Sequence, residues 1–284
     1  MTVRDVLSRL AGHDALNFAL TNYIPRRQAT RFVGWLSKRE TPLVRDVSIG
    51  LWRLFTDIDL SDAKTRDFKS LHDCFTRELK DGARPVDPTP GVATSPCDGI
   101  VVGCGAIEGT RLLQVKGSAY TLEELLGVPE RPEAFRDGTY VTLRLTSAMY
   151  HRFHAPLAGA VERVHYIPGD VWNVNPAALA RVDRLYCRNE RAVIDLRLDD
   201  GTPLTLVPVA AVLVAGLKLR FLDFSRTDAP RTYPVSARLA KGEEMGMFEH
   251  GSTIIVLAPK GWRLAAGVAH GAMLRMGRPL LLAP

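Results

Sequence analysis

The chain of 284 residues lacks any apolar run that could cross a bilayer as a helix. Its longest run, from Leu204 to Leu217, is broken by polar, proline and glycine residues and falls short of the roughly 18–20 residues required. The first residues carry Arg4 and Asp5 and show no compact apolar core before a small-residue cleavage site. We therefore expect neither a spanning helix nor a secretory signal peptide.

Cysteine is scarce, and its positions exclude the usual metal sites. The four cysteines are Cys74, Cys97, Cys104 and Cys187. None forms a paired zinc-ligand spacing, and six residues between two cysteines is not a zinc pattern. We expect reduced thiols of a cytosolic protein and no metal.

Nucleic-acid motifs are also missing, although the net charge is +6 and the isoelectric point is near 9.3. No helix-turn-helix, zinc finger or aromatic RNA-binding signature accompanies this charge. Residues 1–40 hold seven Lys and Arg against three acids, a net charge of +4. The basic excess therefore favours an anionic membrane face over nucleic acid as the partner.

The N-terminal part has the apolar periodicity of amphipathic helices. The residues at helical spacing are Leu16, Leu20 and Tyr23, then Phe32, Trp35 and Leu36, and finally Val44, Val47, Leu51, Leu54 and Phe55. Apolar stripes flanked by arginines suit a membrane interface, where each basic residue contributes about 1 kcal/mol. Packing against the protein's own core is the alternative. We assign residues 1–65 to a helical, membrane-associating region that contacts the surface through residues 1–60.

From Val92 onward the sequence changes to short β-rich runs separated by glycine, proline and aspartate. Residues 62–79 predict a linker and one more helix. Residues 192–198 and 203–209, around Asp199-Asp200-Gly201, predict a hairpin. Thr121 and Glu124 match a capping box that begins a short helix. The fold class predicted is α+β, with N-terminal amphipathic helices followed by a mostly antiparallel β domain over residues 66–284.

Candidate chemistry centres on the Gly251-Ser252 bond. A serine that follows glycine can attack the preceding carbonyl if a base is near, although Gly-Ser-Thr alone is usually a turn. Asp98, at the entrance of a β-rich run, together with His151 and His154, supplies a carboxylate and two imidazoles.

The spacing of His151 and His154 leaves their geometry open. In an extended strand the two imidazoles would face opposite ways, whereas a helical turn begun at Thr146 and ended by Pro156 would place them on one face. A metal pair is a further possibility, but no third ligand sits at a recognisable spacing. The other histidines His13, His72, His165 and His270 are interpreted as non-catalytic.

Motifs along nearly the whole chain resemble those of bacterial phosphatidylserine decarboxylases. The matching segments are Pro96–Gly99, Gln114–Gly117 with Tyr120–Glu123, Tyr150–His154, Tyr166–Asp170, Asn175-Pro176, Arg188–Arg191, Lys241–Gly246, Gly251–Thr253 and Arg275–Gly277. Bacterial members often have leucine before Gly-Ser-Thr, and this chain has His250. An extra titratable group there could change the rate or pH dependence of cleavage.

The resemblance implies a mechanism and a product. Asp98 would orient His154, which takes the proton from Ser252, and cleavage at Gly251-Ser252 would leave a β chain, 1–251, and an α chain, 252–284. Ser252 would become a covalent pyruvoyl group, an electron sink for decarboxylation of phosphatidylserine to phosphatidylethanolamine and carbon dioxide. His151 is the candidate proton donor to the substrate. Arg152 could contact the phosphate or form a structural ion pair.

The same resemblance implies a peripheral protein of the cytoplasmic side of the cell membrane. Its own α and β chains would form a heterodimer, and a homodimer of such pairs is compatible with it. Two rival functions use the same residues. A membrane-associated serine hydrolase would keep Ser252 intact, although the chain has no Gly-x-Ser-x-Gly elbow. A non-catalytic β domain could instead bind acidic lipids through its basic helices.

Overall fold

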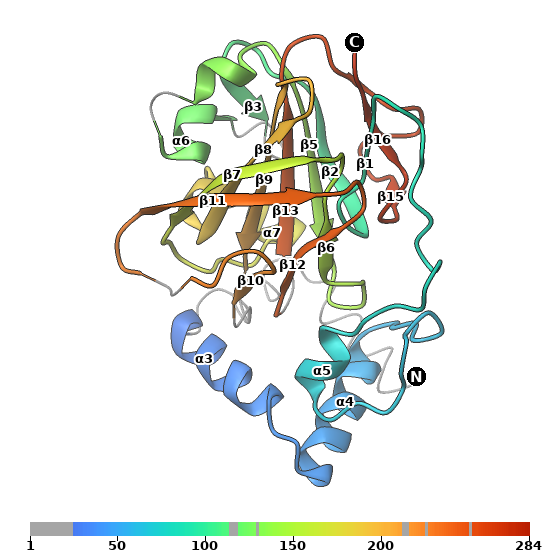
Figure 1. Cartoon of the computed structure of the whole chain (residues 1–284). Helices are drawn as coiled ribbons and strands as arrows, with labels where there is room; N and C mark the ends of the chain where they lie inside the picture. Colours follow the sequence, from blue (N-terminus) through green and yellow to red (C-terminus); the bar gives the residue numbers. More distant parts are fainter. Residues whose placement is uncertain (1–24, 114–118, 129–130, 212–215, 225–226, 250–251) are drawn as a thin grey trace.

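The computed structural model describes residues 25–284 except 114–118, 129–130, 212–215, 225–226 and 250–251. A helical layer lies across one end of a β domain (Figure 1). All pairings between the named strands are antiparallel, so the predicted α+β class is confirmed. The helix expected around Leu16 to Tyr23 and the motif at Gln114–Gly117 lie outside the described residues.

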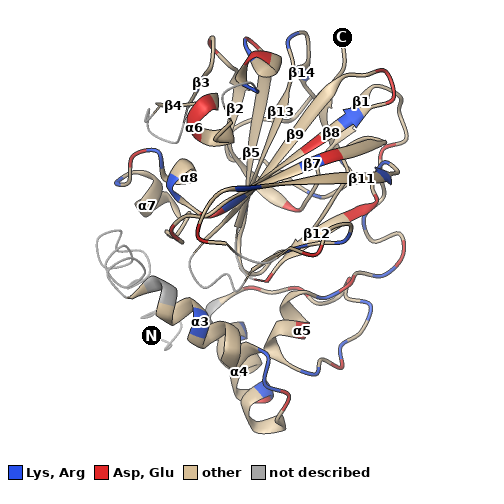
Figure 2. Cartoon of the chain, turned by 60° about the vertical axis from the view of Figure 1, so that its left-hand side comes forward, with Lys and Arg blue, Asp and Glu red and all other residues tan. Residues whose placement is uncertain are grey.

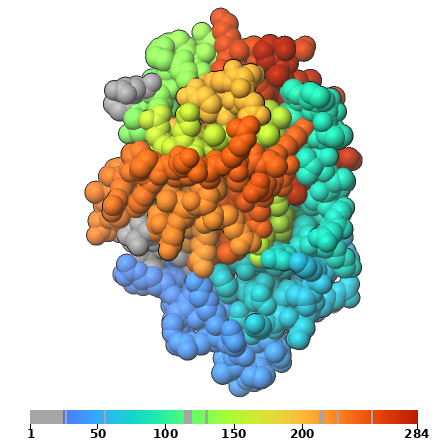
Figure 3. All heavy atoms as spheres, viewed as in Figure 1, coloured from blue at the N-terminus to red at the C-terminus, as the bar shows by residue number. Residues whose placement is uncertain are grey.

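From residue 25 onward, three helices form the helical layer, seen beneath the β domain in Figures 1 and 3. They are α3 (Arg26–Ser37), α4 (Pro42–Phe55) and α5 (Leu71–Phe75). Proline at the first position of α4 has no amide hydrogen to leave unpaired there, and Ser70 caps α5 by accepting from the Asp73 amide. Both α3 and α4 contact α5, which follows the boundary expected at residue 65. Within the described residues, no helix combines the length and apolarity needed to cross a bilayer.

The β domain is built on an eight-stranded sheet with the order β11-β7-β8-β9-β13-β5-β2-β15. Its strands are β2 (Gly99–Ala106), β5 (Thr139–Leu145), β7 (Gly159–Ile167), β8 (Arg191–Leu198), β9 (Pro203–Ala210), β11 (Arg231–Leu239), β13 (Ser252–Ala258) and β15 (Met273–Leu274). The predicted hairpin is β8 and β9, and its turn places Gly201 at a positive φ of 85°. β13 is therefore a central strand, paired on both edges.

Smaller elements cover the two faces of this sheet. Two three-stranded sheets, β10-β12-β6 and β1-β16-β14, accompany it, and β3 pairs with β4. The bounds are β1 (Val92–Thr94), β3 (Arg111–Leu113), β4 (Ala119–Thr121), β6 (Arg152–His154), β10 (Leu217–Leu219), β12 (Glu244–Phe248), β14 (Arg263–Leu264), β16 (Pro279–Leu282), α6 (Leu122–Leu126), α7 (Pro176–Leu179), α8 (Leu185–Arg188) and the 3₁₀ helix Pro132–Phe135. Thr121 and Glu124 form the predicted capping box of α6.

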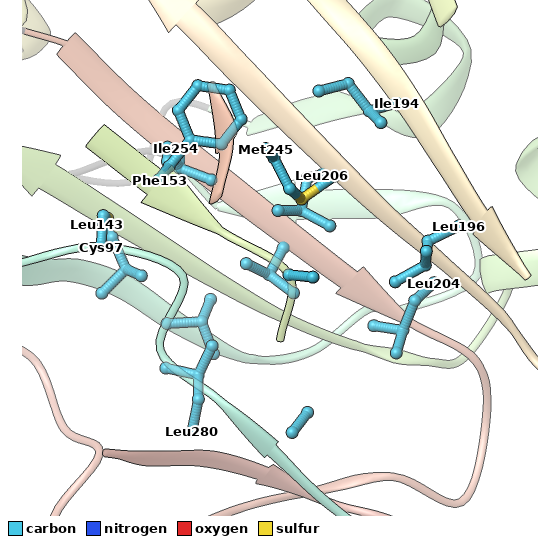
Figure 4. Packing of buried hydrophobic residues seen from close by; sticks show 14 of the residues in the cluster. Cys97, Leu143, Phe153, Ile194, Leu196, Leu204, Leu206, Met245, Ile254 and Leu280 are labelled. Carbon is cyan, nitrogen blue, oxygen red and sulfur yellow. The ribbon is translucent and has the colours of Figure 1, made fainter. Parts of the chain in front are cut away.

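Side-chain alternation along β13 divides the interior into two cores. Ile254 and Val256 face the core shared with β6 and β12, while Ile255 and Leu257 face the core covered by α6 to α8. Figure 4 shows Ile254 beside Phe153 and Met245 in the first core. Each such buried side chain contributes about 1.5–3 kcal/mol. β13 is thus held rigidly from its first residue onward.

Candidate active site

Ser252 is the first residue of β13 and is completely buried. Its register partners are Leu145 at the end of β5 and Ala210 at the end of β9. Among the described residues, no hydrogen-bond partner meets the Ser252 Oγ. A buried hydroxyl normally has a partner, because leaving it without one costs about 1–3 kcal/mol. An unpartnered hydroxyl at this position is suited to reaction.

The segment before Ser252 passes from the small sheet to the large one. β12 ends at Phe248, whose amide donates to the His151 carbonyl over 2.9 Å. The Glu249 amide then donates to the Gly216 carbonyl over 3.0 Å. His250 and Gly251 lie outside the described residues. The candidate scissile bond is therefore approached from an anchored strand and followed by another.

His154 ends β6 and is held at both ring nitrogens. Its Nδ1 lies 2.9 Å from the Gly242 carbonyl oxygen, and its Nε2 lies 3.0 Å from the Tyr150 hydroxyl. A carbonyl only accepts, so Nδ1 carries the hydrogen and Nε2 accepts from Tyr150. Burial lowers the pKa of His154 from its usual value and outweighs the raising effects of the Gly242 hydrogen bond and the Glu244 charge. The neutral imidazole thus presents a basic Nε2.

His151 lies just before β6, in a fully buried position. Its Nδ1 is 2.8 Å from the Met149 carbonyl oxygen, and its ring centroid lies 3.9 Å from that of Phe75 in α5. His154 is in strand β6 and His151 directly precedes it, so the two do not share a helical turn. By register His154 lies opposite Glu244, whereas the His151 carbonyl bonds Phe248, so His151 is nearer to Ser252 along β12.

Arg152, between the two histidines, forms structural contacts. Its Nε donates to the Thr76 carbonyl over 2.9 Å, and its Nη1 contacts both Glu244 carboxylate oxygens at 3.1 and 2.9 Å. Of the two interpretations left open by the sequence, the structure therefore contains the ion pair.

Asp98 immediately precedes β2, as the sequence predicts, but its carboxylate is not bonded to His154. Arg84 binds it through Nε at 2.9 Å and Nη2 at 2.7 Å, and the Met276 amide donates to it over 2.8 Å. The charge of Asp98 has only a minor effect on His154, whose pKa it acts to raise. In the described residues, no hydrogen bond joins Asp98, His154 and Ser252 into a line.

A cavity of about 580 Å³ lies between Tyr150 and the residues that follow α4. Asp98, Arg84, Tyr150 and Arg275 line it, and Thr56 at the end of α4 lines its other side. The lining carries three arginines and four aspartates, and Arg84 is paired with two of these aspartates, Asp62 and Asp98. A polar cavity of this size suits a small-molecule group.

One motif singled out in the sequence, Arg188–Arg191, supports the strand end at this site. The Asn189 side chain donates to the Ala210 carbonyl over 2.8 Å, and the Ala210 amide donates to the Glu190 carbonyl over 2.8 Å. Ala210 is the register partner of Ser252. The Arg188–Arg191 motif therefore fixes the backbone beside Ser252.

Sequence reasoning missed Arg84 and the role of Tyr150. Tyr150 begins the Tyr150–His154 segment, so its closeness in sequence to both histidines could have indicated a contact with one of them. Arg84 lies in an irregular segment 14 residues before Asp98, and no sequence pattern connects the two. Their contact depends on tertiary folding alone.

Comparison with known proteins places the chain among carboxy-lyases, enzymes that release carbon dioxide. A family model for phosphatidylserine decarboxylase matches residues 71–282. Relatives described as phosphatidylserine decarboxylase proenzymes include one from Pseudomonas fluorescens, 36% identical over 93% of this chain and 96% of the relative. The relative from Dickeya dadantii is 34% identical over 94% of this chain and 92% of the relative. The relative from Vibrio cholerae is 36% identical over 94% of this chain and 98% of the relative. The chain belongs to the phosphatidylserine decarboxylase family.

Proposed function

We propose that the chain is the precursor of a pyruvoyl-dependent phosphatidylserine decarboxylase that cleaves itself between Gly251 and Ser252. The observation that carries the proposal is the Ser252 hydroxyl, buried and without a hydrogen-bond partner in the described residues, directly after the scissile bond. The family relatives are described as proenzymes, which agrees with processing of the chain.

Self-cleavage begins with transfer of the Ser252 hydroxyl proton to His154 Nε2. This transfer requires release of Nε2 from the Tyr150 hydroxyl, because the ring nitrogen has one lone pair. The Ser252 oxygen then bonds to the Gly251 carbonyl carbon while the peptide C–N bond breaks and the nitrogen takes a proton, which leaves an ester.

Elimination completes the change at Ser252. Loss of its α-proton forms a carbon–carbon double bond and breaks the Cβ–Oγ bond, so Gly251 leaves as a carboxylate. The remaining enamine tautomerises to an imine, and one water replaces its nitrogen, which departs as ammonia. Residue 252 then carries a ketone in place of its amine.

The pyruvoyl group supplies a ketone that bonds the substrate amine and withdraws the electrons released with carbon dioxide. Residue 252 fits this role because it is buried, and water is therefore kept from the reacting atoms. Of the arginines that line the 580 Å³ cavity, Arg275 would contact the phosphate or the carboxylate of the headgroup. His151 would return a proton to the substrate α-carbon, since imidazole exchanges protons near neutral pH.

The two products of cleavage are expected to remain one heterodimer. Within residues 252–284, β13 pairs with β9 and β5, β15 pairs with β2, and β16 pairs with β1. Breaking one peptide bond leaves all of these ladders in place. Separation would expose the fully buried faces of β13.

The helical layer supports peripheral attachment to the cytoplasmic side of the cell membrane. Six of the seven large, exposed hydrophobic side chains in the described residues lie on α3 and α4, namely Phe32, Trp35, Leu43, Val47, Leu51 and Leu54. Basic residues on the same helices are blue in Figure 2. An apolar face beside positive charge suits the surface of anionic lipids.

Vesicle sedimentation tests this attachment. A variant with Trp35→Ser, Leu43→Ser and Leu51→Ser should lose most of its binding to phosphatidylglycerol vesicles and keep its fold, because all three side chains are more than half exposed. Binding equal to that of the unchanged chain would refute the membrane proposal.

Purified chain mixed with phosphatidylserine vesicles tests the enzymatic proposal. The unchanged chain should run as two pieces on a denaturing gel and release carbon dioxide, and Ser252→Ala should do neither. A serine hydrolase would remain one chain and release fatty acid or headgroup instead. An intact, active chain would therefore refute the proposal.

A further inference from the structure

Glu249, two residues before the scissile bond, is a buried carboxylate on which three parts of the fold converge. Its side chain is 3% exposed, and its Oε1 lies 2.9 Å from Lys38 Nζ, 3.6 Å from His72 Nε2 and 3.7 Å from Lys218 Nζ. Lys38 caps the C-terminus of α3, His72 lies in α5 and Lys218 lies in β10. The helical layer and the small sheet thus meet at the segment that leads to Ser252.

The charges around Glu249 keep it ionised. Burial acts to raise its pKa, but the hydrogen bond from Lys38 and the charges of Lys38 and Lys218 outweigh burial and hold the pKa below its usual range. Burial lowers the pKa of His72, so the lysines carry the positive charge at neutral pH. Lys38 alone among them is within hydrogen-bonding distance in the described residues.

Backbone contacts fix the same residue from the β domain. The Glu249 amide donates to the Gly216 carbonyl over 3.0 Å, and Phe248 before it is bonded to His151. Ser252 after it is fixed in β13. Only two residues separate these anchors, so the approach of the Ser252 hydroxyl to the Gly251 carbonyl depends on where Glu249 is held. A misplacement of 1 Å can slow a reaction about 100-fold.

We propose that Glu249 is a positioning residue for self-cleavage and that its ion pair with Lys38 makes docking of the helical layer a condition for cleavage. This inference rests on the proposed self-cleavage. It assigns the helical layer a role in maturation in addition to membrane contact.

Cleavage kinetics of freshly translated chain test the inference. Translation is stopped, and conversion to two pieces is followed on denaturing gels. Glu249→Gln and Lys38→Met should each slow cleavage by about tenfold or more, because the carbonyl is held less closely. If the two act as a pair, the double variant should be no slower than the slower single variant.

Two lysine variants complete the design. Lys64→Met removes an exposed lysine whose partner is Glu78, and it should cleave at the unchanged rate. Lys218→Met removes a charge near Glu249 without touching the helices. An equal loss of cleavage rate in Lys218→Met and Lys38→Met would show that positive charge near Glu249 matters and docking of the helices does not. That result would overturn the inference.

The outcomes also separate this inference from the proposed function. Unchanged rates in Glu249→Gln and Lys38→Met, with normal cleavage of the unchanged chain, overturn only the inference. A chain that never cleaves refutes the proposed function itself. Should Glu249→Gln fail to fold, Lys38→Met decides, because Lys38 is 47% exposed and its replacement leaves the core intact.

Discussion

Replacing Tyr150 with phenylalanine should lower the pKa of His154. The Tyr150 hydroxyl lies 3.0 Å from Nε2, where it donates to the neutral imidazole and can turn to accept from the protonated one. A hydrogen bond to an ionised group is roughly twice as strong as one between neutral groups. The difference is about 1 kcal/mol, which corresponds to about 0.7 pH unit. Tyr150→Phe should therefore shift the titration midpoint downward by that amount.

The assay is an NMR titration of labelled histidines in the uncleavable Ser252→Ala chain, with His154→Gln to assign the signal. The unchanged site should titrate below 6.5, because burial lowers the pKa of His154. Its nitrogen shifts should report hydrogen on Nδ1. The unfolded chain therefore binds a proton at His154 near pH 6.5 that the folded chain does not bind. The free energy of unfolding should accordingly fall as the pH drops below that value. An unmoved or raised midpoint in Tyr150→Phe, or hydrogen on Nε2 in the neutral ring, would refute the reasoning.

Three further predictions concern catalysis and stability. The His151→Gln chain should still cleave itself but should not decarboxylate the substrate, whereas the His154→Gln chain should not cleave. Denaturing gels report cleavage, and carbon dioxide release reports decarboxylation. Cleavage of the His154→Gln chain would contradict the role given to His154. Arg191→Met should lower the free energy of unfolding, measured by urea titration, by about 3 kcal/mol. The reason is that Arg191 donates to four carbonyls near α6 and α8. A loss below about 1 kcal/mol would contradict this capping role. Gly246→Ala should lower the free energy of unfolding by about 1–3 kcal/mol and slow cleavage, because the added Cβ would lie 2.2 Å from the Lys218 carbonyl oxygen. An unchanged melting temperature and an unchanged cleavage rate would contradict this prediction.

Local patterns predicted the elements of the fold well. The turn at Asp199-Asp200-Gly201 and the capping box at Thr121 depend on neighbouring residues only, and both are confirmed. The periodicity around Phe32 and Trp35 likewise marks α3. The placement of β13 between β9 and β5 could not be predicted, because residues more than 40 apart supply its partners. The domain boundary at residue 65 stays a prediction.

The site was predicted only as a set of residues. The sequence pointed to Asp98, His154 and Ser252, but their spacing does not reveal that Arg84 occupies the Asp98 carboxylate. The spacing of the histidines allowed a helical or an extended backbone, and pairing of β6 with β12 decides it. Such contacts arise from tertiary folding, which a local sequence pattern does not determine.

Mass spectrometry of the purified, unchanged chain tests self-modification most directly. The account predicts two polypeptides, 1–251 and 252–284, with the smaller one lighter by one ammonia than the unmodified sequence and reactive towards hydrazine. A single polypeptide of 284 residues, or a smaller piece that begins with an ordinary serine, would contradict it.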